Sequence, residues 1–568
     1  MNIRFHARDF DPVVAHRLHL LGLPVPLARA LAARGIASET ELSLSTRQML
    51  APQTMSQTVH AARLLADAIE QQRRLLVVAD YDCDGATACA VAVRGLRAMG
   101  ARVDYLVPNR FEFGYGLTPE LVELAARRQP DLMITVDNGI ASVEGVDRAN
   151  ALGIDVLITD HHLPAGRLPA ARAIVNPNQT ECGFASKNLA GVGVMFYVLL
   201  QLRAELRARG HFDETSQPRL DVLLDLVALG TVADLVQLDR NNRILVQAGL
   251  ERIRRGTMHV GIAALFRVAG RDPRTANAAD LGFALGPRIN AAGRLTDMTQ
   301  GIECLLTDDT ERALELAQRL DSLNRERRQI EADMQVSAET HLDAANVDGE
   351  SLAQRRTITI YREDWHPGVV GLIASRIKER HHRPTIAFAP ADAHWLRGSG
   401  RSIEGVHLRD ILDRVTKSAP NLIARFGGHA MAAGLTIRVD ALEQFSRAFE
   451  QAARELTDPA LFTRTLPTDG ALAAGEITHS LVEAINGIVW GQGFAEPLFA
   501  NEFDVLEQRI VKGQHLQLTL ALEGRRWPAI WFRHVQTLPD RARLAYRPVI
   551  DEFRGQRRVS LRIEQMSM

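Results

Sequence analysis

The sequence contains few cysteines, no excess of charge and no long apolar run, and each absence excludes a class of protein. Only four cysteines occur in 568 residues, at positions 83, 89, 182 and 304, and they form no paired ligand spacing. This scatter argues against a disulfide scaffold and a cysteine-based zinc site, and it indicates a reducing cytoplasm. No run reaches membrane-spanning length, and the amino terminus lacks a signal-peptide apolar region, so we expect no membrane association.

The charge balance gives no global sign of a nucleic-acid partner. The 67 basic and 68 acidic residues leave a net charge of −1. Acidic metal ligands would offset a basic surface in this sum, so a local basic channel remains compatible with it. At 568 residues, with 46% hydrophobic content and no repeats, the chain is expected to fold into three or four globular domains.

Helical and strand patterns alternate from about residue 57 and predict a doubly wound parallel sheet. Short helices are expected before residue 55. Helices are then predicted over 60–72, 86–99, 120–128 and 143–152. The strands between them are predicted near 75–79, 103–107, 132–136, 156–159 and 174–175.

The second half of the chain predicts three further regions. Residues 308–345 are rich in Arg, Glu, Gln, Leu and Ala, which favours one long connecting helix, with two stacked helices as the alternative. A second α/β unit follows, and from about residue 461 short alternating strands suit a small antiparallel β-barrel. The expected domains are 1–55 (helical), 56–307 (catalytic), 308–345 (connecting helix), 346–458 (second α/β domain) and 459–568 (barrel).

Aspartates and histidines stand where three apolar strands end. The segments are Asp80-Tyr81-Asp82-Cys83-Asp84-Gly85, Asp137-Asn138-Gly139 and Asp160-His161-His162. A single aspartate at such a place is most often a helix cap or a turn residue. Three such ends would gather five carboxylates and two imidazoles in one crevice, since ligands bind at the carboxyl ends of parallel strands. This ligand chemistry suits Mn²⁺ or Mg²⁺ and predicts a divalent-metal hydrolase.

These motifs, with Asp234 after a probable helix, resemble the four motifs of the DHH phosphoesterase superfamily. The segment 425–434, which contains Gly427-Gly428-His429, is similar to the signature of the DHHA1 domain that follows the DHH domain in this superfamily. Segments 285–294 and 365–369 resemble the RecJ family of single-strand-specific 5′→3′ DNA exonucleases. The resemblance covers roughly residues 20 to 568, with the motifs in the family's order, and it implies an OB-like fold for the terminal barrel.

The resemblance also implies residue roles. Asp137 would bridge two Mn²⁺ or Mg²⁺ ions, His162 would face the scissile phosphate, and Asp160 would orient the histidines. Two metals close together can activate water and stabilise both oxygens of an in-line displacement at phosphorus. The metal ligands it implies are Asp80, Asp82, Asp84, Asp137, His161 and Asp234.

Substrate binding is expected from basic and glycine-rich segments. Arg110, Ser399 and Arg401 would form a pocket for a terminal 5′ phosphate, with Arg288 on the backbone nearby. Gly427, Gly428 and His429 would let backbone amides approach a phosphate, or would form only a tight turn before a helix. The segment around Ser399, with small residues between two arginines, would likewise bind an anion or would form only an ordinary loop. Basic and aromatic groups in the barrel would form a single-strand platform: Arg509, Lys512, Arg525, Arg526 and Trp527.

The function implied is metal-dependent 5′→3′ degradation of single-stranded DNA to mononucleotides in DNA repair and recombination. The resemblance implies a cytoplasmic monomer with single-stranded DNA, a single-strand-binding protein and a RecQ-type helicase as partners. One alternative is a DHH phosphodiesterase acting on short oligonucleotides or cyclic dinucleotides, although these proteins generally lack a barrel. Another is a non-catalytic single-strand-binding scaffold, against which the intact acidic set argues. A pyrophosphatase would need a denser cluster of Lys and Arg.

Overall fold

The computed structural model describes residues 3–109, 112–114, 116–164, 166–345, 354–553 and 556–567. The chain forms two compact units, each assembled from segments that are distant in the sequence. The parallel-sheet unit comprises Asp9–Asn324 and Glu476–Pro497. The barrel unit comprises Met1–Arg8, Arg325–Gly475 and Leu498–Met568.

The parallel-sheet unit is built on five parallel strands in the order β3-β2-β4-β5-β6. Because β3 lies on one side of β2 and β4 on the other, the winding direction reverses at β2, which makes a topological switch point. The predicted doubly wound parallel sheet is therefore confirmed. Its strands are β2 (Arg74–Ala79), β3 (Arg102–Leu106), β4 (Leu132–Val136), β5 (Asp155–Thr159) and β6 (Ala173–Val175).

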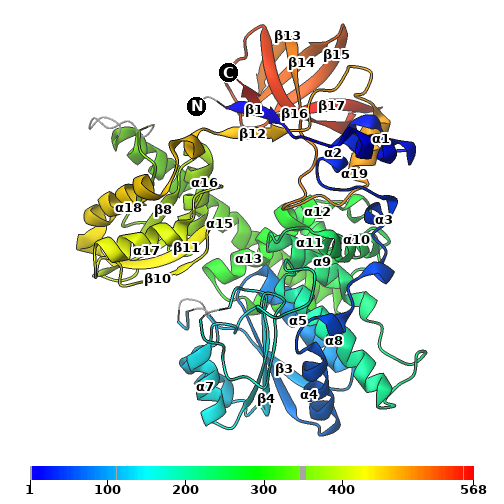
Figure 1. Ribbon diagram of the computed structural model, residues 1–568, viewed down its shortest axis with the longest axis vertical. Helices are drawn as coiled ribbons and strands as arrows, with labels where there is room; N and C mark the ends of the chain where they lie inside the picture. Colours follow the sequence, from blue (N-terminus) through cyan, green and yellow to red (C-terminus); the bar gives the residue numbers. More distant parts are fainter. Residues whose placement is uncertain are drawn as a thin grey trace. The chain divides into compact units, whose positions relative to one another are not determined.

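Both faces of this sheet are covered by helices (Figure 1). Every residue of β4 is buried, as expected for a strand packed on both sides. Leu76 and Val78 point to one face, where they join a core with Leu121 and Val146 of the covering helices. That face carries α6 (Pro119–Ala126) and α7 (Val143–Ala151), and the other carries α4 (Thr58–Glu70), α5 (Cys83–Ala98) and α8 (Gly191–Ala208).

Further helices complete this unit. The short helices predicted before residue 55 are confirmed as α1 (Pro12–Leu20), α2 (Val25–Ala32) and α3 (Glu39–Leu42). A π-helical turn, η5 (Leu281–Leu285), runs directly into α13. The others are α9 (Leu224–Ala233), α10 (Arg240–Arg254), α11 (Val260–Ala269), α12 (Ala278–Asp280), α13 (Gly286–Leu295), α14 (Thr299–Leu306) and α19 (His479–Asn486).

A single long helix links the two units. The helix predicted over 308–345 is confirmed as α15 (Thr310–Ala345), 36 residues long, and the alternative of two stacked helices is wrong. Residues up to Asn324 belong to the parallel-sheet unit, and those from Arg325 belong to the barrel unit.

A five-stranded mixed sheet forms one part of the barrel unit, in the order β10-β11-β9-β8-β7. Only β7 and β8 are parallel. Helix α16 (Val370–His381) packs against β8 and β9, while α17 (Leu408–Ser418) and α18 (Leu442–Leu456) cover the apolar core on the other face. The strands are β7 (Ile358–Tyr361), β8 (Thr385–Pro390), β9 (Trp395–Arg401), β10 (Arg425–Gly428) and β11 (Ala432–Arg438).

The carboxy-terminal strands close into a barrel in the order β13-β14-β15-β17-β16. The pair β15–β17 is parallel and the other neighbours are antiparallel. The predicted barrel is confirmed, but it begins at Phe499 rather than near residue 461, and several strands are long rather than short. The expectation that it is wholly antiparallel is wrong, because β15 and β17 run parallel. They are β13 (Phe499–Val511), β14 (His515–Leu522), β15 (Arg525–Trp531), β16 (Arg541–Phe553) and β17 (Gln556–Ser567).

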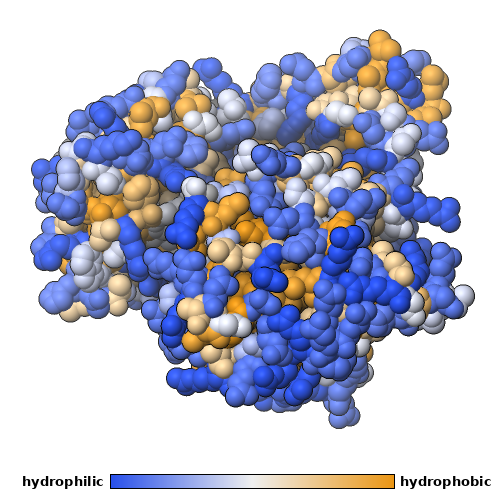
Figure 2. Space-filling model, turned by 60° about the horizontal axis from the view of Figure 1, so that its bottom comes forward, coloured by the Kyte–Doolittle hydropathy of each residue, from blue (hydrophilic) through white to orange (hydrophobic). Residues whose placement is uncertain are grey.

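The amino terminus contributes a strand that the sequence did not predict. Residues Arg4–Ala7 form β1, which pairs in parallel with β12 (Thr465–Thr468). Within the described residues, no helix is long and apolar enough to cross a membrane. The face in Figure 2 is mainly hydrophilic, with smaller apolar patches between the polar side chains.

Candidate metal centre

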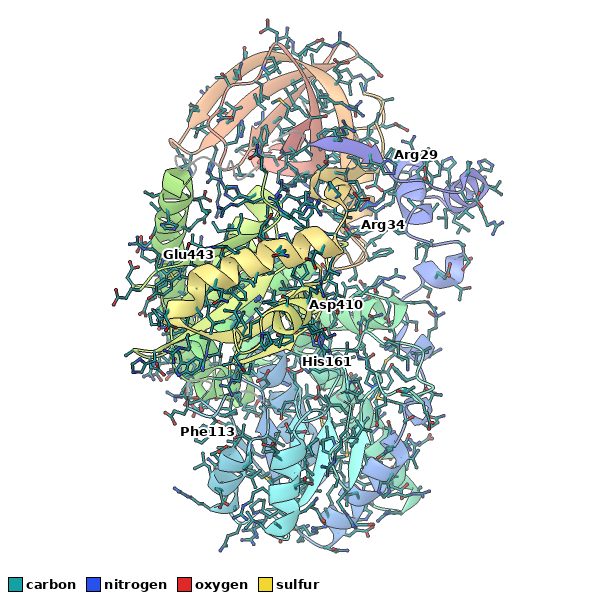
Figure 3. All side chains as sticks on the ribbon, turned by 60° about the vertical axis from the view of Figure 1, so that its left-hand side comes forward. Arg29, Arg34, Phe113, His161, Asp410 and Glu443 are labelled. Carbon is teal, nitrogen blue, oxygen red and sulfur yellow. The ribbon has the colours of Figure 1, made fainter. Side chains whose placement is uncertain are left out.

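The carboxyl ends of three neighbouring strands bring the predicted ligands together. Asp80 follows β2, Asp137 follows β4 and Asp160 follows β5. His161 lies at this end of the sheet (Figure 3). The acids therefore cluster at the topological switch point, where parallel α/β sheets bind ligands.

The loop between β2 and α5 holds three carboxylates in a fixed conformation. Asp82 caps α5 and accepts a hydrogen bond from the Gly85 amide at 3.0 Å. A side chain at Gly85 would stand 2.5 Å from the Asp80 carbonyl oxygen, so only glycine fits there. Asp84 is fully buried and accepts hydrogen bonds from the first two amides of α8, Gly191 at 2.6 Å and Val192 at 2.9 Å.

Asp137 occupies a left-handed backbone conformation, with φ of 63°. Residues other than glycine rarely adopt this backbone conformation, and such strain concentrates at functional sites. The Asn138 side chain supports the turn, because it donates to the carbonyls of Val78 at 3.1 Å and Val136 at 3.0 Å. On the other side, a Cβ at Gly191 would lie only 2.6 Å from the Cβ of Asp137.

Asp160 holds both histidines. Its Oδ1 accepts from the amide of His161 at 2.7 Å, the amide of His162 at 3.1 Å and the His162 Nδ1 at 2.7 Å. Its Oδ2 accepts from the Ile140 amide at 2.9 Å. Burial raises the pKa of Asp160, but the His162 hydrogen bond and the nearby histidine charges outweigh it and lower that pKa overall.

The two histidines have opposite electrostatic environments. Burial, with the nearby His162, lowers the pKa of His161 to about 4, so its ring is neutral at pH 7. Burial also lowers the pKa of His162, but the Asp160 hydrogen bond and the charges of Asp160, Asp80 and Asp82 outweigh it and raise that pKa to about 9. A neutral ring suits a metal ligand, and a charged one suits contact with a phosphate.

Asp234 joins the cluster from a different element, at the end of α9. Its Oδ2 lies 3.5 Å from Nε2 of His161, which is also 3.1 Å from Oδ1 of Asp137. The Asp137 Oδ1 is buried and accepts no hydrogen bond from the described residues. A buried carboxylate oxygen without a hydrogen bond, next to a neutral imidazole, fits a site in which a metal ion would bind both groups.

The cluster contains three overlapping groups whose ligand atoms lie within 4.8 Å of one another. Asp137 belongs to two of them and His161 to two, which fits a pair of ions with shared ligands. His162, predicted to face the phosphate, also lies within one group. The groups are Asp80, Asp82 and Asp137; Asp84, His161 and Asp234; and Asp137, His161 and His162.

The carboxylates are too close together to be ionised comfortably without cations. Burial, followed by the charge of Asp82, raises the pKa of Asp84 to about 7. Burial and the neighbouring carboxylates, Asp84 first, raise the pKa values of Asp137 and Asp234 well above the ordinary range. Bound divalent cations would relieve this repulsion, so the residues present fit the expected metals.

In the barrel unit, Ser399 and Arg401 lie together at the first turn of α16. Their polar atoms are 3.1 Å apart, and a Cβ at Gly371 would stand 2.9 Å from the Ser399 Oγ and 3.1 Å from an Arg401 Nη. Burial lowers the pKa of Arg401, and no described carboxylate forms an ion pair with it. A half-buried arginine at a helix amino terminus is suited to an anion. The segment is a strand, β9, rather than the loop considered from the sequence.

The glycine–histidine segment is part of a β-hairpin. Gly427 and Gly428 end β10, and the His429 amide donates to the Ala432 carbonyl at 2.8 Å before β11 begins. The alternative of a turn before a helix is therefore wrong. Gly428, with φ of 147°, would clash with Ala432 if it carried a side chain, whereas Gly427 faces open space.

Two expected substrate-binding residues remain, Arg288 and Arg110. Arg288, in the parallel-sheet unit, pairs with the buried Asp321 at 2.9 Å and donates to the Ala284 carbonyl at 2.6 Å. Arg110 lies outside the described residues. Gly191 and Gly371 shape the sites and were not expected. Asn138 belongs to a motif that the sequence showed, but its role in supporting the turn was not predicted.

Comparisons with known proteins match the whole chain. The DHH family N-terminal domain matches residues 74–231, the DHHA1 domain residues 354–455 and the RecJ OB domain residues 468–565. The single-stranded-DNA-specific exonuclease RecJ of Escherichia coli K12 is 47% identical over 562 residues, which cover 96% of each chain. The protein of the same name from Bacillus subtilis is 37% identical over 79% of this chain and 55% of its own length.

Solved structures show the same similarity. The crystal structure of RecJ in complex with Mn²⁺ from Thermus thermophilus matches with a TM-score of 0.82 and 28% identity. The match covers 100% of this chain and 79% of that one. A structure of that protein with Mg²⁺ matches with a TM-score of 0.79.

Proposed function

The chain belongs to the RecJ family of single-stranded-DNA-specific exonucleases, and from this membership we propose that it degrades single-stranded DNA from the 5′ end to mononucleotides. It is a metal-dependent exonuclease that takes Mn²⁺ or Mg²⁺. Its role is in DNA repair and recombination.

The observation that carries the proposal is the set of overlapping ligand groups at the end of the parallel sheet. We assign Asp137 as the bridging ligand of two ions, because it belongs to two groups and has a buried oxygen that no described residue satisfies. The complete set of proposed ligands is Asp80, Asp82, Asp84, Asp137, His161 and Asp234.

The chemistry follows from these groups. Two divalent ions held there would supply an activated water and stabilise the attacking and leaving oxygens at phosphorus. Asp160 keeps the His162 ring oriented through the 2.7 Å bond to Nδ1 and holds it protonated. The other ring nitrogen of His162 can then donate to a phosphoryl oxygen as negative charge develops there.

We propose that recognition of the 5′ end rests on the anion site at α16. Ser399, Arg401 and the first amides of α16 would bind a terminal phosphate. A contact from Arg110, which lies outside the described residues, stays a prediction. Gly427, Gly428 and His429 would bind backbone phosphates through the open side of Gly427, and Arg288 is proposed to contact the strand as well.

The test is digestion of end-labelled DNA by the purified protein with Mn²⁺. Release of a 5′ label as mononucleotide, before any 3′ label, is expected from single strands, with much slower release from blunt duplex. A cyclic dinucleotide and a dinucleotide serve as alternative substrates in the same assay. Faster hydrolysis of either would favour the phosphodiesterase alternative, and binding without hydrolysis would favour the scaffold.

The chain binds single-stranded DNA, and we propose that the barrel extends the grip on it. Arg509, Arg526 and Trp527 lie on β13 and β15 of the barrel, and Lys512 lies in the turn after β13. We further propose a cytoplasmic monomer that works with a single-strand-binding protein and a RecQ-type helicase. Sedimentation of the protein alone and with each partner checks this assignment.

A further inference from the structure

The parallel-sheet unit contains a cavity that plays no part in the proposed metal chemistry. Its volume is about 450 Å³, within the size range of ligand pockets. It lies between the amino-terminal helical segment, α10 and residues 487–488, and it is called the α10 cavity below. Its apolar lining consists of Leu31, Leu42, Leu44, Ala248 and Ile488.

One lining residue, Arg243, carries a buried charge that forms no ion pair within the described part of the protein. Its side chain is nearly buried, with 5% of the residue exposed, and its Nε has no hydrogen-bond partner there. Among the described residues no carboxylate forms an ion pair with it. The nearby acids are already engaged: Asp239 accepts from Ser186 at 2.6 Å, and Glu41 accepts from the Ala37 amide at 2.7 Å.

Aromatic stacking fixes the guanidinium of Arg243 in place. Its Cζ lies 4.2 Å from the centre of the Phe494 ring, which stacks on Trp490 at 5.1 Å. Arg34, labelled in Figure 3, contacts the same aromatic pair, with its Cζ 5.6 Å from the centre of the Trp490 ring. The Arg243 side chain is therefore already ordered in the free protein. An anion that binds in the cavity would not have to immobilise it, so binding would cost less conformational entropy.

The rest of the lining decides which anion fits. Glu251 lines the cavity and pairs with Arg255 at 3.2 Å, so the cavity offers one cation beside one acid. A phosphate monoester, with a charge of roughly −1.5 to −2, would be repelled by Glu251 more than a singly charged carboxylate. Ser45, Thr46 and Gln247 supply polar groups at the lining, while the leucines and Ile488 suit an apolar body.

We propose that the α10 cavity binds a carboxylate attached to a small apolar group, with Arg243 as the anion-binding residue. Two sources share this chemistry: a free organic acid, and the C-terminal residue of a polypeptide with an apolar side chain. A buried arginine without an ion-pair partner is costly to the folded protein, and a bound carboxylate would remove that cost.

Isothermal titration calorimetry on the full-length protein tests this site. N-acetyl-L-leucine is compared with N-acetyl-L-leucinamide, which lacks only the carboxylate charge. The acid is expected to bind at least tenfold more tightly than the amide. Octanoate and inorganic phosphate are the further probes: tighter binding of octanoate than of N-acetyl-L-leucine indicates a free acid as the ligand, and the reverse indicates a polypeptide terminus.

Two variants and a control complete the experiment. Arg243→Gln should reduce binding of the acid to that of the amide, and Ala248→Phe should block binding by filling the cavity while leaving Arg243 intact. Arg267→Gln, an exposed arginine on α11 that does not line the cavity, should bind normally. Equal binding of acid and amide, tighter binding of phosphate, or binding unaffected by Ala248→Phe would overturn the proposal.

Discussion

Asp137 combines strain, burial and close contact with like charges at one position. Its left-handed backbone and its carboxylate oxygen, which no described residue satisfies, are difficult to explain by stability alone. Burial, followed by the charges of the neighbouring carboxylates, raises the pKa of Asp137, so the folded protein retains this residue at a cost that bound cations would remove.

Asp137→Asn should separate the effect of Asp137 on the stability of the metal-free protein from its effect on metal binding and activity. Asn has nearly the same shape, so the fold should persist, and the metal-free variant should be at least as stable as the wild type because one repulsive charge is gone. Exonuclease activity should fall at least about 100-fold, or ~2.7 kcal/mol. The Mn²⁺-induced increase in Tm should disappear, as measured by calorimetry. The exposed Asp147→Asn serves as control, and a full Mn²⁺ shift in Asp137→Asn would contradict the bridging role.

Arg401 should distinguish 5′-end recognition from general phosphate binding. Arg401→Ala should slow digestion of 5′-phosphorylated strands more than that of 5′-hydroxyl strands, because only the first can use the charge-assisted contacts, worth ~1.5–3 kcal/mol. The measurement is the ratio of the two rates. Arg526→Ala in the barrel should lower both rates alike. An unchanged ratio in Arg401→Ala would place end recognition elsewhere.

A substitution in the first turn of α8 tests whether this helix positions the ligands of the metal centre. Gly191→Ala would place a Cβ 2.6 Å from that of Asp137, and the Gly191 amide also holds Asp84. We expect at least a tenfold loss of Mn²⁺ affinity, measured by calorimetric titration. Gly193→Ala is the matched control, because its Cβ would meet only the flexible Leu189 side chain at 3.1 Å, and alanine favours a helix by ~1 kcal/mol. Equal Mn²⁺ affinity in the two variants would show that α8 does not position the ligands.

The parallel strands and their acidic ends could be predicted from the sequence because both signals are local. An apolar run that ends in Asp80 or Asp137 indicates a strand and its carboxyl end without reference to the rest of the chain. Strand β9 could not be recognised in this way, because glycines disfavour strands. Gly398 is required there because a side chain would stand 2.5 Å from Phe388 and 2.7 Å from Leu435, which are neighbours that only the folded sheet supplies.

The same limit applies to the candidate site. The acids and histidines were found from residue type and spacing. The roles of Asn138, Gly191 and Asn290 were not predicted, because each acts on a partner from another part of the chain. Asn290, for example, accepts a hydrogen bond at 2.8 Å from the Cys83 amide, 207 positions away.

The division of the chain into interleaved units was likewise beyond local patterns. Residues 476–497 lie between strands of the barrel unit in sequence but belong to the parallel-sheet unit. The Leu238 amide donates to the Gln492 carbonyl at 2.8 Å, and Phe494 stacks on Arg243. Such contacts between residues about 250 positions apart leave no periodic signal in the sequence.

Strand β1 shows the consequence of such distant pairing for stability. It joins β12 across about 460 residues, and within the described part of the chain β12 pairs with no other strand. Ile3, just before β1, is 3% exposed, and its carbonyl accepts a hydrogen bond from Ser567 at 3.2 Å. The amino terminus is therefore expected to hold β12 in place.

Ile3→Ala should loosen this attachment without affecting the metal centre. Removal of a buried isoleucine side chain costs ~2–5 kcal/mol, and a terminal position that can relax should lie near the lower value. Hydrogen exchange should become faster at the amides of β12, while those of β2 and β4 keep their protection. His6→Ala, exposed on the same strand, should leave both rates unchanged. Among the described residues, β1 is the one strand that pairs with β12. Unchanged hydrogen exchange at the β12 amides in Ile3→Ala would therefore mean that something other than β1 protects them.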